Sequence, residues 1–181
     1  TRAFNEVVCD YLAQELDPAS RRKTLIYCVS DSHADLVVDL LKHAFNKQYG
    51  SVDDDAVIKI TGAADKPLQL IRRYKNERQP NVAVTVDLLT TGVDVPEICN
   101  LVFLRQVSSR ILFDQMLGRA TRLCDFGGAE DKVMNRAVGL EDLDLDAAEL
   151  AVVMFGLDGH DLARAGRCGL RGARRQEDLR R

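Results

Sequence analysis

The sequence lacks the features that mark membrane, secreted and disulfide-stabilised proteins. No apolar run approaches the roughly 20 residues that span a bilayer, and no secretory leader opens the chain, so we expect a cytoplasmic protein with no membrane partner. The five cysteines are an odd number and form no C-x-x-C pair, which argues against a disulfide framework and a zinc site. We assign no metal site and expect most of these residues to be reduced core thiols: Cys9, Cys28, Cys99, Cys124 and Cys168.

The chain also lacks a strong excess of charge of either sign. Its formal net charge of -3 argues against a protein that coats nucleic acid through bulk charge, although a local groove of the opposite sign is compatible with it. With 46% hydrophobic and 29% charged residues among 181, there is enough apolar material for one well-buried domain with a small appendage. The sequence begins at Thr1 rather than at a methionine, and we interpret it as a piece of something longer.

Strand-type and helix-type apolar patterns alternate along the first 104 residues. Alternation of this kind predicts an α/β fold with a parallel sheet, right-handed crossovers and a site at the carboxyl ends of the strands. The edges to watch are then Ser30, Thr61 with Gly62, residues 87–94 and Arg105. We expect strands at 24–29, 56–60, 82–86 and 100–104, and helices over 3–16, from the candidate caps at 30–32 to 45, and from 65 to a break at 80–81.

Two of these helices allow more detailed predictions. Ser32 followed by Asp35 resembles a capping box at the start of the second helix. In the third helix we expect Leu68, Ile71 and Tyr74 to face inward. The three histidines of the chain are scattered, and we assign them no role.

The stretch from Phe113 to Leu123 carries the first candidate site. As a helix it places Gln115, Arg119 and Arg122 on one edge, because residues three and four apart are neighbours there. Two guanidiniums and an amide in one plane suit a phosphate chain, since arginine presents a rigid fork of donors and keeps its charge. The alternative is a surface helix with two solvated arginines, which we would prefer for an isolated R-x-x-R.

A second candidate site follows the third expected strand. Asp87 and Asp94 place carboxylates near the strand ends, and Gly92 permits a backbone shape that other residues resist. Such a carboxylate can accept a hydrogen bond from a ribose hydroxyl or pair with an arginine of a neighbouring loop. Taken alone, a turn whose aspartates satisfy backbone donors is at least as good an interpretation.

Together these segments resemble the second RecA-like motor domain of superfamily 2 helicases and translocases. Residues 24–35 are similar to the fourth motif of that family, residues 87–94 to the fifth and residues 115–122 to the sixth. Within the superfamily, the strings VTVDLLTTGVDVP and QMLGRATRLC are similar to the motor (R) subunit of type I restriction enzymes. The resemblance runs from about residue 23 to residue 124, and the linked fifth and sixth strings are more specific than the sixth alone.

The resemblance implies a three-layer fold, with helices on both faces of a parallel sheet, and a set of site residues. Arg122 or Arg119 would act as an arginine finger on ATP, and Gln115 would also reach its phosphates. The implied nucleotide-binding and DNA-binding residues are Gln115, Gly92 and Asp94 for the nucleotide and Ser30, Thr61 and Thr90 for the DNA backbone.

The sequence contains neither a G-x-x-x-x-G-K-[ST] loop nor a D-E-x-[HD] string. The phosphate cradle and the Mg²⁺ ligands must therefore come from a partner, the first RecA-like domain of the same polypeptide. Alone, this chain should neither hydrolyse ATP nor cut DNA. The implied further partners are double-stranded DNA and, in a type I enzyme, the methyltransferase and specificity subunits.

We divide the chain into a leading helix and linker (1–22), the second RecA-like domain (23–125) and a poorly defined extension (126–181). The extension becomes rich in arginine and glycine after residue 159, and we interpret it as a truncated or disordered end rather than a nucleic-acid contact. Two alternative functions remain: half of a DNA-repair or RNA helicase, and a non-catalytic RecA-like interaction scaffold. A Rossmann-like binder is disfavoured, since no glycine fingerprint follows the first strand.

Overall fold

A computed structural model describes residues 1–86, 95–105 and 115 of the chain. Within these ranges the backbone forms a four-stranded sheet in which all pairings are parallel and the strand order is β2-β3-β1-β4. The strands are nearly continuous apolar runs, as is typical of strands covered on both faces. Their bounds are β1 Lys23–Tyr27, β2 Val57–Lys59, β3 Val82–Thr85 and β4 Ile98–Phe103.

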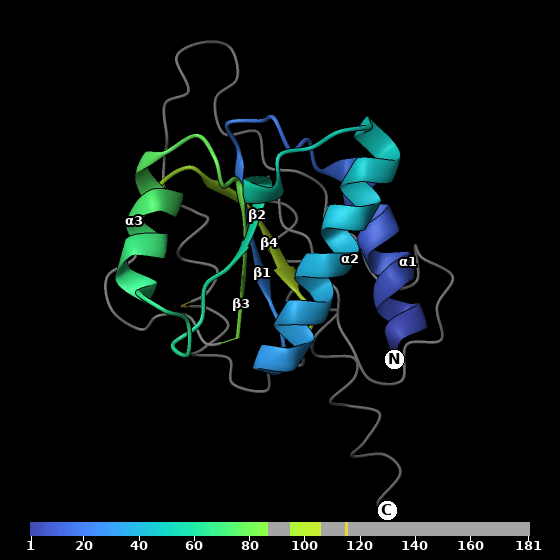
Figure 1. Cartoon of the computed structure of the whole chain (residues 1–181), viewed down its shortest axis with the longest axis horizontal. Coiled ribbons are helices and arrows are strands. Elements are labelled where there is room, and N and C mark those ends of the chain that lie inside the picture. Colours follow the sequence, from blue (N-terminus) through green and yellow to red (C-terminus); the bar gives the residue numbers. More distant parts are fainter. Residues whose placement is uncertain (87–94, 106–114, 116–181) are drawn as a thin grey trace, which may run out of the picture.

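The helices cover both faces of this sheet, which confirms the predicted three-layer α/β arrangement. Figure 1 shows α1 and α2 side by side on one face and α3 on the other. The bounds are α1 Arg2–Glu15, α2 Asp31–Tyr49 and α3 Pro67–Asn76, with a short 3-10 helix at Asp54–Ala56. None of the helices in these described ranges is both long and apolar enough to cross a membrane.

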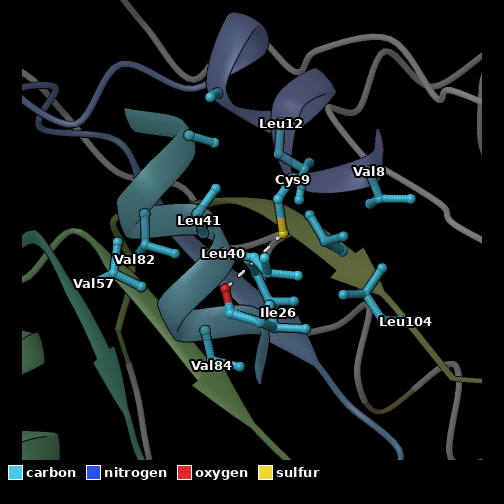
Figure 2. Packing of buried hydrophobic residues seen from close by; sticks show 14 of the residues in the cluster. Val8, Cys9, Leu12, Ile26, Leu40, Leu41, Val57, Val82, Val84 and Leu104 are labelled. Carbon is cyan, nitrogen blue, oxygen red and sulfur yellow. Dashed lines mark hydrogen bonds between the residues drawn. The ribbon is translucent and has the colours of Figure 1, made fainter. Parts of the chain in front are cut away.

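The main core lies between the α1–α2 pair and the sheet. Figure 2 shows Leu12 of α1, Leu41 of α2 and Val84 of β3 converging there, and all three side chains are completely buried. Burial of each such side chain contributes on the order of 1.5–3 kcal/mol. The helix α1 therefore belongs to the same core as the sheet.

Three cysteines lie in the described residues, and all three are buried free thiols, as predicted: Cys9, Cys28 and Cys99. Burial raises the pKa of Cys9 and of Cys28 to about 12, because a thiolate would lose its hydration there. The Cys9 thiol points at the Val37 carbonyl oxygen, 4.0 Å away (Figure 2). Such protonated core thiols are inert, so Cys9 and Cys28 are packing residues.

Two expectations about helix detail are wrong. The N-cap of α2 is Ser30 and not Ser32, because Ser30 keeps an extended backbone while Ser32 already lies in the first helical turn. In α3, Tyr74 is buried but Leu68 is 65% exposed. The inward stripe of α3 runs through Pro67, Leu70, Ile71 and Tyr74, at spacings of three and four, which leaves Leu68 on the outer side.

Lys23, the first residue of β1, is a buried cation at the amino edge of the sheet. Its side chain is only 3% exposed, and its Nζ donates to the carbonyl oxygens of Glu77 and Pro80 at 2.8 and 3.0 Å. The ammonium also lies 4.9 Å from the ring centroid of Tyr74. Burial lowers the pKa of Lys23, while the nearby Glu97 and Glu77 carboxylates oppose that shift. The lysine thus fastens the α3–β3 connection to the sheet.

Candidate functional site

The carboxyl edge of the sheet brings together residues from distant parts of the sequence. Because all four strands are parallel, their carboxyl ends meet at one edge. Ser30 follows β1, Thr61 follows β2, Val86 follows β3 and Arg105 follows β4. This confirms the prediction that these strand ends share an edge.

Ser30 is held by the start of α2. Its Oγ accepts a hydrogen bond from the His33 backbone N–H at 3.2 Å, which satisfies one of the unpaired amides of the first turn. The same oxygen lies 3.2 Å from Ser32 Oγ, and either hydroxyl can be the donor. Ser30 itself is exposed. When Ser32 is the donor in that pair, the Ser30 hydroxyl hydrogen is left for an incoming acceptor.

Thr61 occupies a different environment at the same edge. It is only 4% exposed, and its Oγ1 donates to Asp31 Oδ1 at 2.8 Å. The other oxygen of that carboxylate, Asp31 Oδ2, accepts from Lys59 Nζ at 2.9 Å, and Lys59 also pairs with Asp35 at 2.6 Å. The result is a network that joins the first turns of α2 to the end of β2.

Electrostatics in this network favour the charged forms. Hydrogen bonds from Lys59 and Thr61 lower the pKa of the Asp31 carboxyl. Hydrogen bonds to Asp35 and Asp31 raise the pKa of Lys59. Asp31 and Lys59 are therefore ionised at neutral pH, and the Lys59 ammonium also contacts Asp35. The sequence analysis missed this network. The available signal was Lys59, a charged residue at the end of β2, whose other residues are apolar.

His33 links α1 to the connection between β1 and α2. Its Nδ1 accepts from the Val29 backbone N–H at 3.3 Å, so this nitrogen carries no proton. Its Nε2 lies 3.0 Å from Asn5 Oδ1 and can only be the donor in that pair. Burial lowers the pKa of His33, in keeping with the neutral ring that this geometry requires. The absence of an assigned role was thus a mistake: His33 supports the loop that carries Ser30.

Arg105 joins the ends of two strands that are not neighbours. Its Nη1 donates to the Val86 carbonyl oxygen at 2.8 Å, although β1 lies between β3 and β4. Hydrogen bonds from a guanidinium are among the stronger ones in proteins. Arg105 thereby fixes the point at which the chain leaves β3.

The predicted site residues are described only in part. Ser30 and Thr61 lie at the carboxyl edge, and Gln115 is helical and exposed. Predictions for Gly92, Asp94 and Thr90 concern residues outside the described ranges. The same holds for the two candidate finger arginines, Arg119 and Arg122.

The chain belongs to the family of the helicase conserved C-terminal domain, whose model matches residues 5–124. That range contains the 87–94 string and the Q-x-x-G-R-x-x-R string at 115–122. The match establishes the family, and the parallel sheet with helices on both faces agrees with a RecA-like domain.

Two similar proteins are subunits of type I restriction enzymes. The chain is 58% identical over 126 residues to the type I restriction enzyme EcoKI endonuclease subunit of Escherichia coli K12; the alignment covers 67% of this chain and 11% of that subunit. A solved fragment assigned to an HsdR subunit of a type I restriction enzyme from Vibrio vulnificus YJ016 superposes with a TM-score of 0.59. It is 30% identical, and the match covers 67% of this chain and 24% of the fragment.

A more distant structure supports the fold alone. Domain 2 of the DEAD-box helicase Mss116p matches with a TM-score of 0.54 at 16% identity, over 67% of this chain and 46% of that one.

The chain spans about a tenth of the curated restriction subunit that it matches. The resemblance to the motor subunit of type I restriction enzymes, predicted from the fifth and sixth motif strings, is confirmed.

Proposed function

We propose that this chain is the C-terminal motor half of an ATP-dependent DNA translocase, the R subunit of a type I restriction enzyme. The observation that carries the proposal is the 58% identity to the EcoKI endonuclease subunit over 126 residues. The parallel sheet supports it, because the carboxyl ends of its four strands meet at one edge, where RecA-like domains place their sites.

In this proposal the chain contributes the closing half of a nucleotide cleft. Arg122 or Arg119 approaches the transferred phosphoryl group as an arginine finger, and Gln115 contacts the phosphates. Gly92 and Asp94 line the cleft. A guanidinium that reaches developing negative charge only in the closed cleft couples hydrolysis to domain movement.

ATP and Mg²⁺ are held mainly by the first RecA-like domain of the same polypeptide. No group of three or more His, Cys, Asp or Glu side chains suited to a metal ion occurs in the part of the chain that the structure describes. We assign the metal ligands and the phosphate-binding loop to that partner domain because the sequence holds neither a G-x-x-x-x-G-K-[ST] loop nor a D-E-x-[HD] string.

The DNA-facing surface is the carboxyl edge of the sheet, with Ser30, Thr61 and Thr90 near the backbone of the duplex. Alternating grip on phosphates by the two RecA-like domains would move the protein along double-stranded DNA. The exposed Ser30 hydroxyl is the described group best placed to donate to a phosphate oxygen. The methyltransferase and specificity subunits supply sequence recognition, and the assembly works in the cytoplasm.

The second candidate, half of a general DNA-repair or RNA helicase, is a weaker proposal. The relative that is 58% identical to this chain is a subunit of a restriction enzyme. A non-catalytic scaffold is disfavoured because a scaffold needs neither Arg119 nor Arg122.

DNA-stimulated ATP hydrolysis by the full-length polypeptide containing this segment tests the proposal. We expect Arg122→Ala or Arg119→Ala to lower kcat on the order of 10³-fold with ATP binding largely retained. The matched control is Arg72→Ala, since Arg72 is an exposed arginine on α3. The scaffold would be the better interpretation if DNA did not stimulate ATP hydrolysis by wild type, or if Arg122→Ala and Arg119→Ala both kept full activity.

A further inference from the structure

Two hydroxyls at the carboxyl edge differ in what they can offer to DNA. A phosphate oxygen is an acceptor, so a hydroxyl that contacts it must have a hydrogen to give. Ser30 is exposed, and the Ser32 hydroxyl 3.2 Å away can be the donor in their pair, which leaves the Ser30 hydrogen free. Thr61 is 4% exposed, and its hydrogen is directed at Asp31 Oδ1, 2.8 Å away. Thr61 can donate to a phosphate only by abandoning an ionised carboxylate.

Asp31 connects the two loops that carry these hydroxyls. It follows Ser30 in the chain as the first residue of α2, and its carboxylate binds both Thr61 and Lys59 from the end of β2. The strands β1 and β2 are not neighbours, because β3 lies between them. The Asp31 side chain therefore links the β1–α2 loop to the β2–α3 loop.

We propose that Asp31 is a positioning residue for DNA-backbone binding, and that Thr61 is its partner rather than a phosphate donor. The inference rests on the proposed DNA-translocating function and refines its binding edge. Asp31 fixes the distance between the two loops, so that Ser30 and the backbone at Gly62 face the duplex together. Gly62 suits this arrangement, since it is exposed and a side-chain carbon built there meets no atom within 4 Å.

Loss of an ion pair with Lys59 is the competing explanation, and the chain offers a matched control for it. Asp35 lies one helical turn beyond Asp31 and binds the same ammonium, Lys59, at 2.6 Å. No hydrogen bond joins Asp35 to Thr61 among the described residues. Replacing Asp35 therefore removes the same unit of negative charge and leaves the link between the loops in place.

The test is the binding of a fluorescently labelled DNA duplex by the full-length polypeptide containing this segment. We expect Asp31→Ala and Thr61→Val each to weaken binding by roughly three- to tenfold, since contacting residues typically couple to this extent. The double variant should bind no worse than either single one, because both remove the same contact. Thr61→Ser keeps the hydroxyl and should bind like wild type, and Asp35→Ala should not weaken binding.

The DNA concentration that half-saturates ATP hydrolysis should rise in parallel, with kcat at saturating DNA unchanged. A general loss of structure would instead lower kcat and the melting temperature. Thr61→Val is nearly isosteric, so it decides the matter even if Asp31→Ala unfolds the protein.

Several results would overturn the proposal. Equal weakening by Asp31→Ala and Asp35→Ala would point to the ion pairs that both aspartates make with Lys59 rather than to the link with Thr61. Additive losses in the double variant would show two independent contacts. Unchanged binding by Thr61→Val would show that the link has no role, while leaving the translocase proposal intact. A wild-type polypeptide that binds no duplex would contradict both proposals.

Discussion

Replacing Lys23 tests the packing at the amino edge of the sheet. Lys23→Met keeps most of the aliphatic stem but removes the ammonium, which leaves the Glu77 and Pro80 carbonyls without this donor. An unsatisfied buried acceptor costs about 1–3 kcal/mol. The variant no longer has to bury a charged ammonium, and the desolvation cost that it avoids offsets part of this loss. We therefore expect Lys23→Met to lower the free energy of unfolding by about 1–3 kcal/mol.

Lys23→Ala provides the second measurement in this series. It also removes the methylene, sulfur and methyl group that methionine keeps at a site that is 3% exposed, and each buried group of methylene size contributes about 0.8 kcal/mol. The alanine variant should thus be less stable than the methionine variant by roughly 2 kcal/mol.

Urea unfolding followed by far-ultraviolet circular dichroism measures both differences. Lys42→Met is a suitable control, because Lys42 lies on α2 with a long 3.9 Å contact to an exposed aspartate. A methionine variant at position 23 as stable as wild type would refute the reasoning, since the two carbonyls would then have no need of the ammonium.

Three further predictions concern other parts of the described structure. Tyr74→Phe removes a buried 2.8 Å hydrogen bond to the Thr24 carbonyl and should lower the unfolding free energy by about 1 kcal/mol in the same urea experiment; an unchanged value would contradict it. Burial lowers the pKa of His33, so the unfolded chain binds more protons and stability should fall as pH drops below about 6.5; His33→Gln should remove this dependence, measured as melting temperature against pH. Gly50→Ala should cost about 1 kcal/mol at a φ of 85°, whereas Gly62→Ala, in open space, should be neutral; equal effects on the melting temperature would rule this out.

The strands were predictable because parallel strands covered on both faces consist of nearly continuous apolar runs, which are easily recognised in a sequence. Each expected strand overlaps an observed one, and the observed bounds differ from the expected ones by no more than a few residues. The order of the strands was not predictable in the same way. An apolar run indicates that a strand is buried, but it does not indicate which strands lie beside it.

The errors have local physical causes. The expected strand at 24–29 left out Lys23, because charged residues usually flank buried runs; here two carbonyls and an aromatic ring make its burial possible. Leu68 was assigned to the inner side of α3, but the inward stripe runs from Pro67 to Leu70 and Ile71 and leaves Leu68 on the outer side.

The candidate site was predictable as an edge and not as a set of contacts. Ser30 and Thr61 were placed there by the rule that parallel strands end together, and the structure agrees. The bonds from Asp31 to Lys59 and Thr61 join residues 28 and 30 positions apart. Helical and strand periodicities describe near neighbours, so such a contact leaves no periodic trace in a single sequence.

Movement along DNA tests the central claim most directly. The full-length polypeptide, assembled with its methyltransferase and specificity subunits, would be given a duplex with a third strand bound at a distance from the recognition site. We predict that wild type displaces the third strand only with ATP and Mg²⁺, after a delay that grows with the distance. Of Arg122→Ala and Arg119→Ala, the variant that removes the arginine finger should no longer displace the third strand. Arg72→Ala should displace it like wild type. Displacement without ATP, or none by wild type while the assembly binds DNA, would contradict the account.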